Sequence, residues 1–296
     1  MCGIVGLFIK NAALEPELGK LLSGMLEEMT ERGPDSAGFA VYGNTVSNGL
    51  KATLRAPSHA RAQVVADELA AQLHATADTR DTHVVMRIAE DTVLALHEAL
   101  AHDYSDLELV GLGQRMEIYK EVGLPAQISS RFELASMAGT HGIGHTRMAT
   151  ESAVTTDGAH PFSTGRDQCL VHNGSLSNHN RLRDLLRRRG VTIETMNDTE
   201  VGAAYLSWQM REGLSLGEAL ERSLIDLDGF YTFVVGTENG FGVLRDPIAC
   251  KPAVMAETDD YVAFGSEYRA LADLPGIANA RLFEPEPATV YFWERS

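Results

Sequence analysis

Residues 1–6 read Met-Cys-Gly-Ile-Val-Gly, and this stretch decides how the rest of the chain is interpreted. Removal of the initiator methionine would leave Cys2 at the N-terminus, so that one residue carries both a thiol and a free α-amino group. Thiolates are strong nucleophiles, and a partly neutral α-amino group can accept the thiol proton through one water. Cys2 is therefore a candidate nucleophile with its own base. The alternative is structural, because an unpaired cysteine is often simply a buried small hydrophobe.

The composition indicates a globular protein with a sizeable core. The 296 residues are 44% hydrophobic and 22% charged, which suffices for one large or two small cores. A net charge of −16 repels phosphate backbones and argues against a nucleic-acid partner. We find no signal sequence and no apolar stretch of the roughly 20 residues that span a bilayer, so we expect no membrane partner.

The cysteines are few and widely spaced. Cys2, Cys169 and Cys250 form no Cys-x-x-Cys pair, so we expect neither a disulfide framework nor a metal or iron–sulfur site on this chain. A reducing compartment fits this usage, and we predict a cytoplasmic location.

Hydrophobic periodicity predicts an α+β fold. Residues 4–9 have the pattern of a buried strand, and apolar residues then recur at helical spacing over 14–29. Strands at 39–42 and 46–55 are predicted to form a hairpin around Gly43-Asn44. Residues 58–136 alternate helical stretches with short strands, which indicates an inserted α/β lobe.

The second half of the chain continues this pattern. Further strands are predicted at 142–148 and 168–172, helices at 178–189 and 198–210, and mostly strands from Gly229 onward. The order of elements favours sheets packed face to face with helices outside, over a parallel doubly wound sheet.

Two strand ends carry residues that have both a structural and a functional interpretation. Arg147, in Gly-His-Thr-Arg-Met-Ala-Thr, has a planar guanidinium suited to a carboxylate, although an exposed salt bridge would also explain it. Asn173-Gly174 is a favoured hairpin turn, yet no return strand follows it. The alternative is an oxyanion hole made by the Asn173 amide and the Gly174 N–H.

Two further segments have both a structural and a functional interpretation. Residues 197–200, Asn-Asp-Thr-Glu, match a capping box with Asn197 as the N-cap and Glu200 at the third helical position. Functionally, Asp198 could instead bind an ammonium group. The segments 245–247 and 265–267, Arg-Asp-Pro and Gly-Ser-Glu, are by themselves ordinary turns and helix starts.

Taken in order, these segments resemble the class II glutamine amidotransferases, which are N-terminal-nucleophile hydrolases. The motifs are Cys-Gly-Ile-Val-Gly at 2–6, Arg-Gly-Pro-Asp-Ser-Ala-Gly at 32–38, Gly-His-Thr-Arg-Met-Ala-Thr at 144–150, His-Asn-Gly at 172–174, Asn-Asp-Thr-Glu at 197–200, Asp-Gly-Phe-Tyr-Thr-Phe at 228–233 and Arg-Asp-Pro at 245–247. The resemblance implies a four-layer αββα sandwich. It implies one amidotransferase domain over 2–296, with an insertion at about 58–136.

The resemblance also implies a catalytic role for three residues. Cys2 would be the nucleophile, with its amino group as the base, and Asn173 with Gly174 would form the oxyanion hole. Attack on the side-chain amide of L-glutamine would release ammonia and leave a thioester, which water then hydrolyses to glutamate.

Three more residues are implied to bind the substrate. Arg147 would hold the α-carboxylate of glutamine, Asp198 its α-ammonium group, and Thr150 would line the pocket. The stretch after Arg147 would close over bound glutamine. The sequence departs from many family members here, because Met148 and Glu151 stand where an aromatic residue and a histidine are usual.

The chain ends where the hydrolase fold would end, so we expect a separate synthase partner that consumes the ammonia. The resemblance is to the stand-alone amidotransferase subunit of glutamate-synthase-like complexes, including N-methylglutamate synthase. It implies no cofactor on this chain, with flavin mononucleotide (FMN) and any iron–sulfur cluster on partner subunits. Arginines over 181–189 suit docking, or are simply a solvated helix end.

Two other functions are weighed against this one. An independent amidohydrolase would act on another amide, which Arg147 and Asp198 argue against. A non-catalytic scaffold or regulatory subunit would assemble without using Cys2, which the nucleophile and oxyanion motifs argue against.

Overall fold

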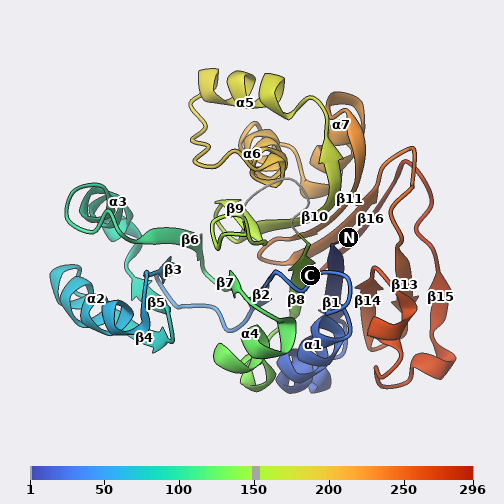
Figure 1. The fold of residues 1–296 in the computed structure, drawn as a ribbon, viewed down its shortest axis with the longest axis horizontal. Coiled ribbons are helices and arrows are strands. Elements are labelled where there is room, and N and C mark those ends of the chain that lie inside the picture. Colours follow the sequence, from blue (N-terminus) through green and yellow to red (C-terminus); the bar gives the residue numbers. More distant parts are fainter. Residues whose placement is uncertain (1, 149–153, 296) are drawn as a thin grey trace.

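The computed structural model describes residues 2–148 and 154–295, and within them a seven-stranded antiparallel sheet forms the centre (Figure 1). Its strand order is β15-β13-β14-β1-β8-β2-β7. The N-terminal strand β1 therefore lies in the interior of the sheet, between β14 and β8. The strands are β1 Gly3–Ile9, β2 Ser36–Tyr42, β7 Met116–Val122, β8 His141–Arg147, β13 Val254–Glu257, β14 Tyr261–Gly265 and β15 Arg281–Phe283.

A second antiparallel sheet, of five strands in the described residues, packs face to face on the first. Its order is β16-β12-β11-β10-β9, so β10 is next to the edge and pairs with β11 from Cys169 to Leu176. Apolar side chains such as Ile4, Phe8 and Phe241 fill the space between the two sheets. The strands are β9 Phe162–Gly165, β10 Gln168–Leu176, β11 Gly229–Gly236, β12 Gly240–Arg245 and β16 Thr289–Glu294.

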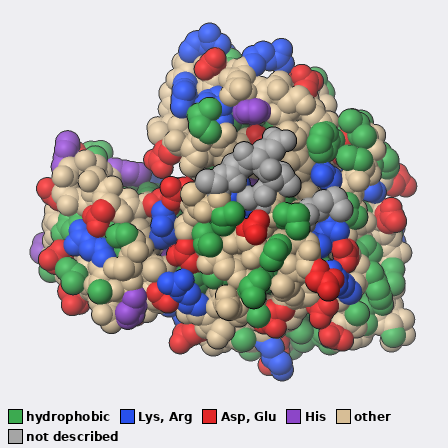
Figure 2. Space-filling view, in the orientation of Figure 1, with side chains coloured by type: hydrophobic (Ala, Val, Ile, Leu, Met, Phe, Trp, Pro, Cys, Tyr) green, Lys and Arg blue, Asp and Glu red, His purple; other side chains and the backbone are tan. Residues whose placement is uncertain are grey.

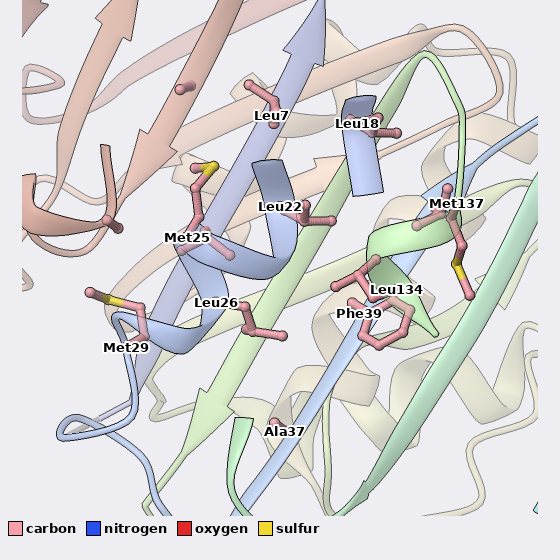
Figure 3. Packing of buried hydrophobic residues seen from close by; sticks show 14 of the residues in the cluster. Leu7, Leu18, Leu22, Met25, Leu26, Met29, Ala37, Phe39, Leu134 and Met137 are labelled. Carbon is pink, nitrogen blue, oxygen red and sulfur yellow. The ribbon is translucent and has the colours of Figure 1, made fainter. Parts of the chain in front are cut away.

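Helices cover the outer face of each sheet and complete four layers (Figure 1). Leu18, Leu22, Met25 and Leu26 recur every three or four residues along α1 and pack on β1, β8 and β2 (Figure 3). The layers are α1 Leu18–Glu27 and α4 Pro125–Arg131 on one side, and α5 His179–Arg188, α6 Asp198–Arg211 and α7 Leu216–Asp226 on the other. The predicted αββα sandwich is confirmed, whereas α7 was missed.

A smaller lobe with its own apolar core projects from one side of the sandwich (Figure 1). Its sheet has the order β4-β5-β3-β6, and α2 packs against β4 and β5. The elements are α2 His59–Gln72, α3 Val93–His102, β3 Leu50–Arg55, β4 Thr76–Arg80, β5 His83–Ile88 and β6 Glu108–Gly113. The insertion predicted at 58–136 overlaps this lobe, but the lobe's sheet also includes β3, and β7 belongs to the sandwich.

The predicted hairpin around Gly43-Asn44 is wrong. β2 pairs with β7 and β8 in the large sheet, whereas β3 pairs with β5 and β6 in the lobe. The turn signal is real, but here it marks the passage between two sheets. Short 3₁₀ helices complete the connections: η1 Ala12–Glu17, η2 Glu90–Thr92, η3 Leu134–Ser136, η4 Tyr268–Leu271 and η5 Ile277–Asn279.

Candidate active site

Strand alternation brings the predicted site residues to one end of the sandwich. In β8 and β10, Ile143 and Val171 point between the sheets, so Arg147 and Asn173, an even number of residues further on, share that orientation. Cys2 lies two residues before Ile4, which also points between the sheets, and so shares its orientation. The β1–β8 register pairs Gly3 with Thr146, and continuing it by one residue places Cys2 opposite Arg147.

Cys2 is half-buried, and its carbonyl oxygen is held from two directions. Asn173 Nδ2 donates to this oxygen at 3.2 Å, and Arg32 Nε donates to it at 3.0 Å. The first contact joins the two sheets directly at the candidate nucleophile. Asn173 therefore lies beside Cys2, as the predicted oxyanion role requires.

Asn173-Gly174 is not a hairpin turn. Both residues lie inside β10 and pair with Thr232 and Tyr231 of β11. Gly174 has φ +147°, and a Cβ built on it would lie 1.9 Å from the carbonyl oxygen of Phe230. Only glycine fits this backbone and this space, so the requirement at position 174 is conformational as well as chemical.

Arg147 ends β8 and is 9% exposed, which places it inside the molecule and not on the rim. Its backbone carbonyl accepts a hydrogen bond from the Asp35 N–H at 3.1 Å. A Cβ on Gly158 would lie 2.9 Å from Arg147 Nη1, so the absence of a side chain at 158 leaves room for the guanidinium. Residues 149–153 lie outside the described residues, as does Met1; they include Thr150, Glu151 and part of the predicted closing stretch after Arg147.

Asp198 is the first residue of α6, and its carboxylate faces β10. Oδ2 accepts the Leu176 N–H at 2.9 Å, and Oδ1 lies 3.8 Å from His172 Nδ1. These contacts orient the carboxylate beside the strand that carries Asn173. The side chain remains 23% exposed, which is compatible with the predicted contact to an ammonium group but does not test it.

The predicted capping box at the start of α6 is half correct. The Asn197 side chain accepts the Thr199 N–H at 2.9 Å, so Asn197 is the N-cap. Glu200 does not return to Asn197. Its carboxylate accepts the N–H groups of Glu194 and Thr195 at 2.7 and 2.6 Å, because the preceding loop folds back over the first turn of the helix.

Behind these residues lies a buried network that we did not predict. Thr199 Oγ1 lies 3.0 Å from His172 Nδ1 and 3.1 Å from His160 Nε2. His145 stacks on His160 with ring centroids 3.9 Å apart, and its Nε2 donates to the His172 carbonyl at 3.1 Å. The network thereby connects His172 and Thr199, which are adjacent in sequence to Asn173 and Asp198. It also includes His145 of β8, which lies two residues before Arg147.

The histidines of this network are neutral at physiological pH. Burial lowers the pKa of His145 to about 3, although its hydrogen bond to the His172 carbonyl opposes this shift. Burial also lowers the pKa of His160 and of His172, although the Asp198 carboxylate opposes the shift at His172. These imidazoles therefore act as hydrogen-bonding groups and add no positive charge beside Arg147.

Comparison with known proteins identifies the family. A family model described as a glutamine amidotransferase domain matches residues 145–273. The chain is 60% identical over 296 residues to the glutamine amidotransferase-like protein GlxB of Rhizobium meliloti, an alignment covering 99% of this chain and 98% of that protein. The chain belongs to the class II glutamine amidotransferase family.

The chain is also similar to part of two longer proteins. The glutamine–fructose-6-phosphate aminotransferase of Vibrio vulnificus is 34% identical over 142 residues, which are 48% of this chain and 23% of that protein. The fold is similar to glutamine phosphoribosylpyrophosphate amidotransferase from B. subtilis, with a TM-score of 0.63 at 20% identity over 99% of this chain and 47% of that one. This likeness confirms the predicted N-terminal-nucleophile hydrolase fold.

Within residues 2–148 and 154–295, no group of three or more His, Cys, Asp or Glu side chains is arranged to hold a metal ion. No helix in that part of the chain has the length and apolar character needed to cross a bilayer.

Sequence reasoning missed two groups around Cys2. The histidine–threonine network was not proposed, although His145, His172 and Thr199 all lie inside quoted motifs. Arg32 and Glu267 were quoted as parts of a motif and a turn, without a role, yet Arg32 contacts Cys2 directly. For His145, His172 and Thr199, the signal available was their position in motifs that also supply candidate site residues, whereas the segments of Arg32 and Glu267 supply none.

Proposed function

We propose that this chain is a glutaminase subunit that hydrolyses the side-chain amide of L-glutamine and supplies ammonia to a partner synthase. The observation that carries the proposal is the meeting of Cys2, Arg147 and Asn173 at one end of the sandwich. A glutamine held at its α-carboxylate by Arg147 would extend its amide toward a thiol directly opposite in the strand register.

The chemistry then needs only groups from this chain and water. The α-amino group of Cys2 accepts the thiol proton, and Sγ attacks the amide carbon to form a tetrahedral oxyanion. One Asn173 Nδ2 hydrogen goes to the Cys2 carbonyl, and we assign the other, with the Gly174 N–H, to that oxyanion. The C–N bond breaks as the amine returns the proton, ammonia leaves, and water hydrolyses the γ-glutamyl thioester to glutamate.

Asp198 is assigned to the α-ammonium group of the substrate. Its carboxylate is oriented by the Leu176 N–H and keeps an exposed fraction. A substrate with one cationic and one anionic group is then held between Asp198 and Arg147, which fixes where its amide lies. We assign Thr150 to the same pocket from its place in the motif.

The partner is assigned to the glutamate synthase or N-methylglutamate synthase type. In this assignment FMN and any iron–sulfur centre reside on partner subunits, and the complex works in the cytoplasm. Figure 2 shows Lys and Arg side chains gathered over α5. Exposed Arg181, Arg187, Arg188 and Arg189 give this region a positive charge on an acidic chain, which suits contact with an acidic partner surface. Arg183 is buried and donates to Asn180 and Met196.

Intact-mass spectrometry with 6-diazo-5-oxo-L-norleucine, a glutamine mimic that alkylates the nucleophile, tests the proposal. We expect loss of Met1 and a single adduct that disappears in Cys2→Ala. The matched control is Cys250→Ala, which removes the exposed cysteine and should leave the adduct unchanged. The variants that form the adduct should also be those that hydrolyse glutamine, and this turnover should rise when partner subunits are added.

Other outcomes support the alternatives. Rapid hydrolysis of a different amide with poor use of glutamine would indicate an independent amidohydrolase. A retained Met1, or no adduct while complexes assemble normally in Cys2→Ala, would indicate a scaffold or regulatory subunit, and the proposal would then be withdrawn.

A further inference from the structure

A partly buried ion pair, between Arg32 and Glu267, lies next to Cys2 and has no assigned role. Arg32 follows α1 and is 8% exposed, and Glu267 follows β14. Arg32 Nη1 lies 2.6 Å from Glu267 Oε1. The Arg32 hydrogen bond lowers the pKa of Glu267 below its ordinary value, so the pair is charged at neutral pH.

Arg32 connects this ion pair to the nucleophile. Its Nε donates to the Cys2 carbonyl at 3.0 Å, while Nη1 of the same planar guanidinium contacts Glu267. A guanidinium presents these donors in a rigid fork, so the orientation of the carboxylate determines the direction of the Nε–H. Glu267 therefore acts on Cys2 through Arg32.

The two contacts to the Cys2 carbonyl come from different parts of the fold. Arg32 approaches from the turn after α1, and Asn173 approaches from β10. Because the peptide group is planar, fixing its oxygen also restricts rotation about the Cα–C bond of Cys2. That rotation determines where the α-amino group and thiol point relative to the strand.

The next residues of β1 are held by the same segment that carries Glu267. The Ile4 N–H donates to Ser266 Oγ at 2.9 Å, and the Ser266 N–H donates to the Ile4 carbonyl at 2.9 Å. Residues 265–267 therefore secure β1 directly at Ile4 and through Arg32 at Cys2. The Gly-Ser-Glu segment is more than a turn.

We propose that Arg32, oriented by Glu267, is a positioning residue that fixes Cys2 for attack on the substrate amide. This inference rests on the glutaminase function proposed above. Arg32 touches neither substrate nor thiol in this assignment. Its contribution is to reduce the number of orientations that the nucleophile adopts, so its loss should lower kcat more than it raises KM.

The charge arrangement provides a matched control. Arg269 Nε also contacts Glu267, at 2.8 Å from Oε2, but the Arg269 side chain is 37% exposed and its other partner is Glu31. Arg269→Gln removes a cation from the same carboxylate and leaves the Arg32 contact in place. Glu267→Gln keeps the side-chain size and removes the charge that orients Arg32.

The test compares Glu267→Gln, Glu267→Asp, Arg32→Lys and Arg269→Gln in the full-length chain, with folding monitored by melting temperature. We expect kcat for glutamine to fall about 10-fold in Glu267→Gln with KM within about twofold, and to fall at least as far in Arg32→Lys, which lacks the Nε–H. Glu267→Asp should recover part of the loss, and Arg269→Gln should stay within about twofold of wild type.

A second measurement separates this inference from the function on which it rests. Iodoacetamide labelling of Cys2, counted by peptide mass spectrometry relative to Cys250 in the same molecule, reports a reactive thiol without requiring glutamine. Wild type that labels at Cys2 but does not turn over glutamine overturns the proposed function and, with it, this inference. Wild-type turnover with unchanged kcat in folded Glu267→Gln and Glu267→Asp overturns this inference alone.

Discussion

The site end of the sandwich and the projecting lobe are held together by different kinds of interaction. Around Cys2, buried polar side chains such as Asn173, His172 and Thr199 contact one another or the backbone over distances of 3.0–3.2 Å. The lobe instead has an apolar core of Leu, Val, Ile, Met and Ala side chains between its sheet and helices. The structure around Cys2 depends on individual polar contacts, whereas the packing of the lobe core depends mainly on the total volume of its apolar side chains.

The contact between these two regions is charged and partly open. Arg55 contacts Glu108 at 2.8 Å and also Asp157, while Lys120 of β7 lies 3.2 Å from Glu108. Burial acts to raise the pKa of Glu108, but the charges of Lys120 and Arg55 outweigh it and lower the pKa. A polar cavity of about 880 Å³ adjoins this contact. These ion pairs join the lobe to the sandwich beside an apolar contact, because Val85 of β5 and Val110 of β6 are buried in the apolar clusters of the sandwich.

This comparison predicts that adding a single methyl group at the site end has the largest effect on glutamine turnover. Gly174→Ala adds one methyl group where the backbone has φ +147° and the Phe230 oxygen leaves no room. Moving β10 displaces the Asn173 amide and the Gly174 N–H together, so we expect glutamine turnover to fall at least about 100-fold. Gly217→Ala in α7 is the control, because nothing lies within 4 Å of its added Cβ. Turnover near wild type in a folded Gly174→Ala variant would contradict the oxyanion assignment.

Mild acid should destabilise both regions. Burial lowers the pKa of His141 and His145 in the sandwich, and of His83 where β5 meets the sandwich, to about 3 each. Below about pH 6.5 each takes up a proton in the unfolded chain but not in the folded one. The contribution of each buried histidine to the free energy of unfolding is therefore fully present above about pH 6.5. It is lost as pH falls toward 3, by about 1.4 kcal/mol per pH unit for each histidine.

Urea unfolding at a series of pH values between 7 and 5 measures this slope. His83→Gln removes one of these histidines and should reduce the slope by one histidine's share, while His141, His145 and the other buried histidines, His160 and His172, keep the rest. A pH-independent free energy of unfolding over this range would show that these imidazoles are not held neutral by burial.

The smallest effect on turnover is expected from the lobe core. Leu69 of α2 is fully buried there, and Leu69→Ala should cost about 2–5 kcal/mol of stability. Because the lobe has a separate core, glutamine turnover at 25 °C should stay within about twofold of wild type. Leu170→Ala is the matched variant in the sandwich, since Leu170 is equally buried in the strand that carries Asn173. Equal losses of turnover in the two variants would mean that the lobe supports the site directly.

Local sequence patterns predicted much of the sandwich. Alternation placed β1, β8 and β10, and Asn197 marked the start of α6. Patterns failed at β2 and β3, where a turn signal did not reveal which sheet the next strand joins. They also failed at Glu200, whose carboxylate binds the backbone of the preceding loop and not that of Asn197. A turn motif specifies a change of direction but not the partner strand.

By itself the sequence determined the candidate nucleophile, the two strands that carry Arg147 and Asn173, and a fold in which sheets pack face to face. These follow from residue type and from periodicities of a few residues, which are local properties. Only the tertiary structure decided that Glu267 contacts Arg32, from 235 positions away in the chain, and that Thr199 lies between two histidines. Such contacts depend on how strands from distant segments are registered and on which faces pack together, and no short stretch of sequence contains that information.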